Sequence, residues 1–285
     1  MSGIWSRRGA MALGLGAAAL GLGGAADAGP LDWGIDYGAA TDPATARRYR
    51  LLVLEPDHAR PIAPLRGAGA TLLGYVSFGE VERQRPYVAA LERAGALLAP
   101  NPNWPDARLA DLRHPLWRAT LIDTVIPAIL AQGYDGIFVD TLDNAEALEA
   151  REPGAMAGMV AAGAALIAAV RARFPRMRIM LNRGYAALPQ AAAHVDLVLA
   201  EAMATRWSFA ARRYERLSDD DWAWQATRLR AAQARNPALQ AMTLDYWDPA
   251  DPRAVAALYA RERAAGFRPY VATLALDHLL PEPRA

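Results

Sequence analysis

The 285-residue chain contains no cysteine and no lysine, and its positive charge comes from 31 arginines. Without cysteine there is no disulfide, thiolate nucleophile or cysteine-bound metal. Without lysine, Schiff-base chemistry and a lysine general base are excluded. The four histidines are dispersed and form no His-x-His pair, which argues against a histidine-bound metal. These absences direct the search for catalytic groups to the carboxylates.

The chain also lacks an excess of positive or negative charge. The formal net charge is +1, and no run of basic residues interrupts the balance. This composition does not favour a nucleic-acid partner. No glycine-rich phosphate-binding loop is recognisable, which weakens the case for magnesium–phosphate chemistry. With 53% hydrophobic residues, the chain can bury a large core.

The first 28 residues have the pattern of a targeting segment. Arg7 and Arg8 precede the small, apolar run 10–22, and Ala26-Asp27-Ala28 follows as a small-x-small cleavage site. The apolar run is too short for a comfortable membrane span. We therefore predict a secretory signal peptide over 1–28, a mature domain over 29–285 that is secreted or periplasmic, and no stable membrane span after cleavage. An uncleaved amphipathic anchor is the alternative.

Eight apolar segments, most with a polar group at the end, are predicted as strands. They are Trp33–Tyr37, Leu51–Glu55, Thr71–Glu80, Gly136–Asp140, Arg178–Asn182, Leu197–Glu201, Ala241–Asp245 and Pro269–Asp277. Helical patterns lie between them at Pro61–Arg66, Gln84–Ala94, Leu116–Gln132, Ala155–Phe174, Asp219–Arg235 and Arg253–Ala265. Eight strand–helix repeats in a chain of this length predict an α/β fold with a single (β/α)8 TIM barrel. The segment Leu97–Pro115 is predicted as one long loop.

In such a barrel the polar groups at the strand ends meet at one mouth. These groups are Asp36, Glu55, Glu80, Asp140, Asn182, Glu201, Asp245 and Asp277. Two carboxylates that flank a glycosidic bond can hydrolyse it, one as acid and one as base or nucleophile. Aromatic residues near the same ends could stack on sugars, although each could equally be ordinary packing: Tyr37, Tyr75, Trp104, Tyr246 and Trp247. A carboxylate–magnesium site remains open as an alternative.

The segments Gly74–Glu82, Tyr134–Asp143 and Leu181–Gly184, together with Glu201, resemble glycoside hydrolase family 114, and Trp104–Leu112 is also similar. The resemblance runs from about residue 33 to 277. It implies an endo-α-1,4-polygalactosaminidase-like TIM barrel that cleaves galactosamine-rich polysaccharide without a cofactor or metal. An acidic mouth would attract the positive amines of such a polymer.

The resemblance also implies residue roles. Asp140 would act as nucleophile or base, and Glu201 as general acid/base. Retention of anomeric configuration is the favoured outcome, by analogy with other α-acting barrels that place acids on the fourth and sixth strands. The predicted substrate-binding residues are Asp36, Tyr75, Glu80, Trp104, Asp143, Asn182, Asp245 and Tyr246. For Asp143, a helix N-cap is an equally open alternative, and a non-catalytic carbohydrate-binding barrel is the rival for the whole protein.

Overall fold

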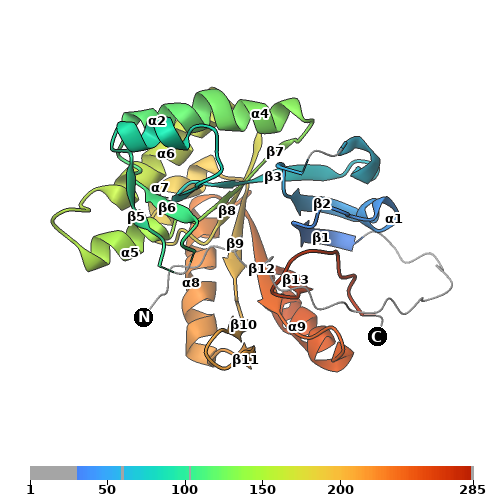
Figure 1. The fold of residues 1–285 in the computed structure, drawn as a ribbon. Coiled ribbons are helices and arrows are strands. Elements are labelled where there is room, and N and C mark those ends of the chain that lie inside the picture. The colour runs from blue at the N-terminus through green and yellow to red at the C-terminus, as the bar shows by residue number, and fades with distance from the viewer. Residues whose placement is uncertain (1–30, 59–60, 103, 284–285) are drawn as a thin grey trace.

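A computed structural model describes residues 31–58, 61–102 and 104–283, so the predicted signal peptide lies outside the described residues. Eight parallel strands stand side by side in a nearly closed barrel, with helices between them (Figure 1). In barrel order these are β1 (Leu31–Asp36), β2 (Tyr49–Leu54), β3 (Thr71–Ser77), β7 (Gly136–Asp140), β8 (Arg178–Asn182), β9 (Leu197–Glu201), β12 (Gln240–Tyr246) and β13 (Arg268–Ala272). The predicted TIM barrel is confirmed.

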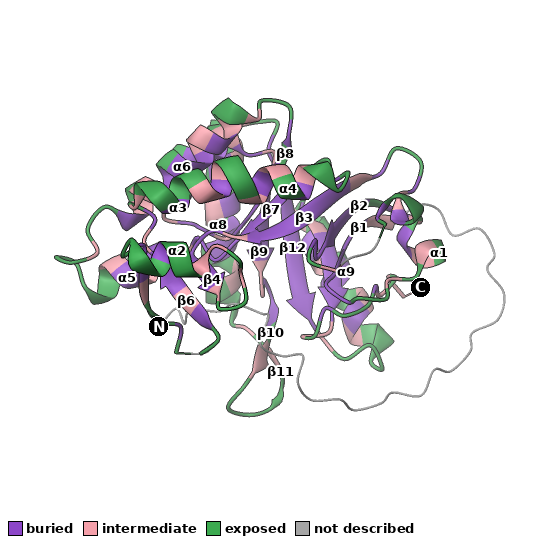
Figure 2. Cartoon of the chain, turned by 45° about the horizontal axis from the view of Figure 1, so that its top comes forward, coloured by how far each residue is buried: buried purple, intermediate pink, exposed green. Residues whose placement is uncertain are grey.

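The barrel strands are continuous apolar runs because both of their faces are covered. All five residues of β7 are buried, and Figure 2 shows the central strands as the buried part of the molecule. The parallel register places Asp140 opposite Ser77 of β3, Asn182 opposite Leu199 of β9, and Glu201 opposite Leu244 of β12. The polar ends of β7, β8 and β9 therefore lie at the same edge of the sheet.

The helices cover the outside of the barrel. They are α1 (Pro43–Ala46), α2 (Val88–Arg93), α3 (Pro115–Thr120), α4 (Ile126–Ala131), α5 (Asn144–Arg151), α6 (Met159–Arg173), α7 (Leu188–Ala191), α8 (Asp219–Arg235) and α9 (Pro252–Ala264), with 3-10 turns at Ala63–Leu65 and Ala192–His194. Helix α8 has the predicted bounds. Ser218 caps it by accepting from the Asp221 backbone N–H, and three aspartates occupy its first turn.

The two ends of the sheet, β1 and β13, are joined by side chains. The Trp33 indole donates to the Arg268 carbonyl at 2.9 Å, and the Arg268 guanidinium pairs with Asp32. The C-terminal segment adds backbone contacts, since the Tyr37 N–H donates to the Leu276 carbonyl at 2.6 Å. The barrel is closed at this seam by these groups.

The structure corrects the prediction for Thr71–Glu80 and Leu97–Pro115. Barrel strand β3 ends at Ser77, and Glu80 begins a separate strand, β4 (Glu80–Glu82). A small antiparallel sheet pairs β4 with β6 (Ala107–Ala110), and β6 with β5 (Leu97–Pro100), where one long loop was predicted. Strands β4 and β6 are separated in sequence, since Glu82 pairs with Ala107, and local periodicity does not reveal such pairing.

Other boundaries also differ. The predicted last strand, Pro269–Asp277, ends at Ala272, which leaves Asp277 exposed in the C-terminal segment. The predicted helix Leu116–Gln132 is broken into α3 and α4 by a π-helical turn at Leu121–Val125, just before Pro127, whose ring cannot continue a regular helix. Helix α5 and a hairpin of β10 (Thr205–Ser208) and β11 (Arg213–Arg216) were not predicted. Within the described ranges, no helix is long and apolar enough to cross a membrane.

Candidate active site

Asp140, Asn182 and Glu201 form one hydrogen-bonded group at the ends of β7, β8 and β9. The Asn182 Nδ2 donates to Asp140 Oδ1 at 2.9 Å and to Glu201 Oε2 at 2.6 Å. Because one nitrogen touches both, these two carboxylate oxygens are no more than about 5.5 Å apart. This upper limit lies below the roughly 6.5–9.5 Å between the carboxyl groups of inverting glycosidases and is compatible with the roughly 5–5.5 Å of retaining ones.

Asp140 is held on both of its oxygens. The Tyr75 hydroxyl donates to Oδ2 at 2.9 Å, while Asn182 binds Oδ1. Burial raises the pKa of Asp140, and the charge of Glu201 raises it further; the hydrogen bonds from Asn182 and Tyr75 oppose that rise. Glu201 is half-buried and so faces the open mouth. The two carboxyl groups therefore sit in different surroundings.

The residue that follows each of these three side chains has a left-handed backbone. The φ angles are 62° at Thr141, 52° at Arg183 and 54° at Ala202. Non-glycine residues rarely adopt this region, and such strain concentrates at functional sites. Thr141 is fully buried, and its hydroxyl accepts from the Gly79 N–H at 2.9 Å. A Cβ at Gly79 would lie 2.2 Å from the Thr141 carbonyl, so glycine is required there.

Asp143 and Arg183 lie beside the same group. Burial is the main cause that raises the pKa of Asp143 to about 6; the Arg183 guanidinium opposes it and the charges of Asp140 and Glu201 add to it. The Arg183 Nε is 3.8 Å from Asp143 Oδ2. Asp143 occupies the N-cap position of α5, but its side chain makes no capping hydrogen bond. The capping alternative is therefore not what holds this carboxylate.

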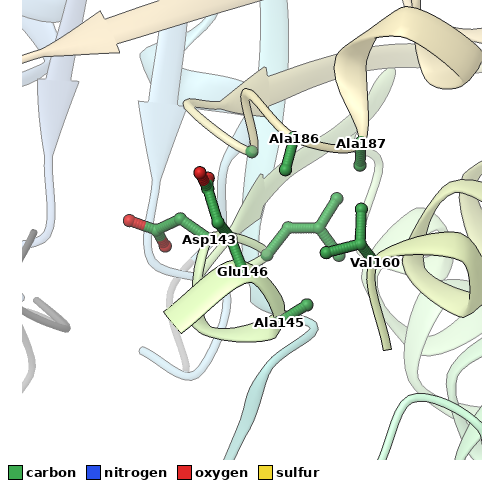
Figure 3. Close-up of a pocket in the computed structure, with 8 residues that line it drawn as sticks. Asp143, Ala145, Glu146, Val160, Ala186 and Ala187 are labelled. Carbon is green, nitrogen blue, oxygen red and sulfur yellow. The ribbon is translucent and has the colours of Figure 1, made fainter. Parts of the chain in front are cut away.

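A small apolar crevice of about 150 Å³ lies next to Asp143. Figure 3 shows the carboxyl groups of Asp143 and Glu146 at one side and the methyl groups of Val160, Ala186 and Ala187 at the other. Its lining is dominated by methyl groups, so it offers few donors or acceptors for a sugar. We regard it as packing beside the site.

Glu80 connects two loops at the mouth. It is buried, and its Oε1 accepts from Asn101 Nδ2 and from Asn144 Nδ2, each at 2.7 Å. Asn101 belongs to the insertion between β3 and α3, and Asn144 directly follows Asp143. Glu80 therefore ties the insertion to the loop that carries Asp143; a role in binding substrate stays a prediction.

Asp245 is buried at the end of β12 and serves a loop. Its Oδ1 accepts from the Ala204 N–H and the Thr205 N–H, both at 2.7 Å, and from the Thr205 hydroxyl at 3.1 Å. Burial raises the pKa of Asp245 to about 6, against these hydrogen bonds. The neighbouring Tyr246 is also buried, and its N–H donates to the Thr205 hydroxyl. Both residues fix the chain just after Glu201.

Of the other residues predicted at the strand ends, Asp36, Tyr37 and Glu55 make contacts near the ends of their strands, and Asp277 is exposed. Asp36 is buried, and its Oδ1 accepts from the Gly38 N–H at 2.7 Å. Tyr37 packs edge to face on Tyr75, with ring centroids 5.2 Å apart, which places the end of β1 beside the site. Glu55 accepts from the Asp57 N–H. Asp277 is exposed and contacts His278. The prediction that it ends the last strand is wrong, because that strand ends at Ala272, five residues earlier.

Trp104 is half-buried in the turn between β5 and β6, where its ring meets Phe209. Arg183 and Thr141 were not predicted as site residues. Arg183 stands in the Leu-Asn-Arg-Gly segment of the family resemblance, which is the one signal that could have found it. Nothing in the sequence signals Thr141. Among the described residues, no group of three or more His, Asp or Glu side chains is arranged to hold a metal ion.

Comparisons with known proteins show the family of the chain. A model of the glycoside-hydrolase family GH114 matches residues 23–284. The glycoside hydrolase domain of PelA from Pseudomonas aeruginosa is 30% identical, with a TM-score of 0.78 over 89% of this chain and 99% of that one. Ega3 from Aspergillus fumigatus, solved with galactosamine, shares the fold at 16% identity, with a TM-score of 0.62 over 88% of this chain and 94% of that one. Among curated proteins, none matches in sequence. The chain belongs to glycoside hydrolase family GH114 and is a glycoside hydrolase.

Proposed function

We propose that this glycoside hydrolase cleaves an α-linked, galactosamine-containing polysaccharide with retention of configuration. The observation that carries the mechanism is the pair Asp140 and Glu201, whose nearest oxygens are bridged by the single Asn182 nitrogen. The limit that this sets on their separation supports the closer spacing of retaining glycosidases over the wider spacing that holds a water in inverting ones.

Asp140 is the nucleophile in this proposal. Protein donors hold both of its oxygens, from Tyr75 and Asn182, and such donors favour the ionised form that must attack the sugar. Its attack on the anomeric carbon forms a covalent ester as the glycosidic bond breaks. Glu201, half-buried at the open mouth, gives its proton to the departing sugar oxygen. It then removes a proton from the water that releases the ester.

The charge of the site supports a cationic substrate. Asp140, Asp143 and Glu201 lie together with Arg183 as the nearby counter-charge, although the whole chain has a net charge of +1. An unacetylated galactosamine unit carries a positive amine, which such a site attracts. The family membership and the galactosamine bound by Ega3 support the same sugar.

The test is cleavage of two polymers that differ only in acetylation. Purified protein should generate new reducing ends on the unacetylated galactosamine polymer faster than on the N-acetylated one. NMR of the first product should show the α-anomer. Asp140→Asn should abolish both signals, whereas Asp277→Asn, the same change at an exposed position, should not. A β-anomer as first product, or equal rates on both polymers, would contradict the proposal.

Export is proposed separately, from the pattern of residues 1–28. A cleaved signal would place the enzyme in the periplasm or outside the cell, where its polymeric substrate is found. N-terminal sequencing of the exported protein should begin near Gly29. Recovery of a cytoplasmic protein that starts at Met1 would contradict it.

A further inference from the structure

Two insertions that the sequence pattern did not reveal meet at the mouth of the barrel. Trp104 lies in the turn between β5 and β6, within the insertion that follows β3. Phe209 lies in the turn of the β10–β11 hairpin, which follows β9. Their rings meet edge to face, with centroids 6.4 Å apart and planes at 78°. This contact joins loops that leave two different barrel strands.

The contact spans the strands that carry the proposed catalytic pair. In the barrel, β7 and β8 stand between β3 and β9, and they end in Asp140 and Asn182. All loops that follow parallel barrel strands leave from the same face. A bridge from the loop after β3 to the loop after β9 therefore crosses the mouth beside Asp140 and Asn182.

The turn that carries Trp104 is anchored to the site. The backbone N–H of Trp104 donates to the Asn101 carbonyl at 3.2 Å, and the Asn101 side chain donates to the buried Glu80 carboxylate. Glu80 also holds Asn144, one residue after Asp143. The position of Trp104 is thereby tied to the loop at the end of β7.

The base of the β10–β11 hairpin is anchored on the other side. Asp245 accepts from the first residue of β10, Thr205. The Tyr214 ring packs on Trp207 at 4.9 Å and on Trp247 at 6.3 Å, and its hydroxyl accepts from the Leu274 N–H. The tip, in contrast, is exposed (Figure 2). There the exposed fraction of Phe209 is 44%, so its ring is open to a ligand.

Trp104 also has an unused donor. Its indole Nε1 is buried, yet it has no hydrogen-bond acceptor among the described residues. Buried polar groups are normally paired, so this indole N–H calls for a partner. A sugar offers both things that this side chain lacks, an oxygen to accept from Nε1 and an apolar face to stack on the ring.

We propose that Trp104 and Phe209 form an aromatic clasp that binds one sugar ring of the polysaccharide, away from the scissile bond. This assignment rests on the proposed function, because the occupant is a unit of the same polymer. The clasp adds affinity for a long chain and leaves the chemistry at Asp140 and Glu201 unchanged.

The experiment compares a polymer with a short substrate. Trp104→Ala and Phe209→Ala should each raise KM for the unacetylated galactosamine polymer about tenfold. For an aryl α-galactosaminide, which fills only the positions next to the catalytic pair, kcat and KM should stay within about twofold of wild type. Trp104→Phe should recover part of the polymer affinity, since it keeps a ring and loses the N–H. The double alanine variant should be little worse than either single one, because both act on the same sugar.

Two controls keep the outcomes separate. Phe174→Ala removes a ring at the end of α6, just before β8 begins and so at the opposite end of the barrel, and should leave polymer KM unchanged. Polymer affinity is also measured by titration of the Asp140→Asn protein with and without Trp104→Ala, so the clasp is judged by binding alone. Unchanged affinity in the folded Trp104→Ala and Phe209→Ala proteins, or an equal loss of kcat on the short substrate, would overturn the clasp. A wild-type protein that binds the polymer but never cuts it would instead overturn the proposed function.

Discussion

Asp140 and Asp245 are both buried aspartates near the ends of barrel strands, but they are held by different parts of the chain. Asp140 accepts from two side chains, Tyr75 and Asn182, one on each oxygen. Asp245 accepts three hydrogen bonds on one oxygen, and two of them come from backbone N–H groups of the loop after β9. The first arrangement orients a carboxylate toward the mouth, whereas the second uses a carboxylate to fix a loop.

The difference shows that the position of a carboxylate at a strand end does not by itself reveal its role. Position at the mouth is shared by both residues, and burial raises the pKa of both. What separates them is where the donors come from: side chains of two neighbouring strands donate to Asp140, in addition to the backbone of Thr141, whereas the chain just after β9 supplies all three donors to Asp245. Side-chain donors from neighbouring strands orient a carboxylate in a site that a substrate can enter. Backbone donors from a loop use the carboxylate as an acceptor that holds the loop in place. The comparison can be tested at each residue in turn.

The largest expected effect is at Asp140. Asp140→Asn should lower kcat on the galactosamine polymer by at least about 1,000-fold, because an amide cannot act as the nucleophile. The melting temperature should change little, since the amide oxygen still accepts from a neighbour. Steady-state kinetics and thermal melts measure the two quantities. Activity within tenfold of wild type would mean that another group attacks the sugar.

Changes at Asp245 should affect stability more than catalysis. Asp245→Ala should lower the free energy of unfolding by about 3 kcal/mol, because three donors around Ala204 and Thr205 lose their buried acceptor. Asp245→Asn is the matched control: it keeps one oxygen and should cost less. Urea denaturation followed by circular dichroism gives both values. If Asp245→Asn instead raised KM in a fully stable protein, the predicted substrate-binding role would stand.

Tyr75→Phe sharpens the account of Asp140 itself. Loss of the hydroxyl removes one donor to the ionised carboxylate, so kcat should fall about tenfold. The same loss should raise the pKa of Asp140 further, and the acid limb of the kcat/KM profile should move to higher pH. Tyr37→Phe, in the ring that packs on Tyr75, serves as the control. An unmoved acid limb would show that Tyr75 does not tune Asp140.

The smallest effect concerns Glu262, a buried carboxylate on α9 away from the proposed catalytic pair. Trp222 Nε1 donates to its Oε1 at 2.8 Å, while its Oε2 has no partner among the described residues. Burial, followed by the charge of Asp245, raises the pKa of Glu262 to about 7. A raised folded-state pKa stabilises the fold at low pH, and that stability is lost as pH rises through about 7.

We therefore expect the free energy of unfolding to fall by about 1 kcal/mol between roughly pH 6 and pH 8 through this group. Glu262→Gln cannot ionise and should remove that part of the dependence. Asp277→Asn, at an exposed position, is the control and should leave the slope unchanged. A slope that persists in Glu262→Gln would assign the pH dependence to other carboxyl groups, such as Asp143 and Asp245.

Much of the barrel could be predicted, because its strands have to be apolar to be buried on both faces. All eight predicted strand segments contain the matching barrel strand or overlap most of it, and the segments ending at Asp140, Asn182 and Glu201 have the observed bounds. The insertion β4–β6 and the β10–β11 hairpin escaped prediction. Their strands are only three or four residues long, so they carry no alternating pattern long enough to recognise, and β4 pairs with a strand that is distant in sequence.

The sequence by itself determined the repeated apolar segments, the polar residues at their ends, and the absence of cysteine and lysine that leaves carboxylates for catalysis. Those features follow from burial and residue chemistry, which are local. Only the tertiary structure decided which carboxylates meet: Asn182 brings Asp140 and Glu201 together, Asp245 is drawn to a backbone loop, and Asp277 is left in solvent. The physical reason is that hydrogen-bond partners across strands are set by register and barrel closure, which no single segment encodes.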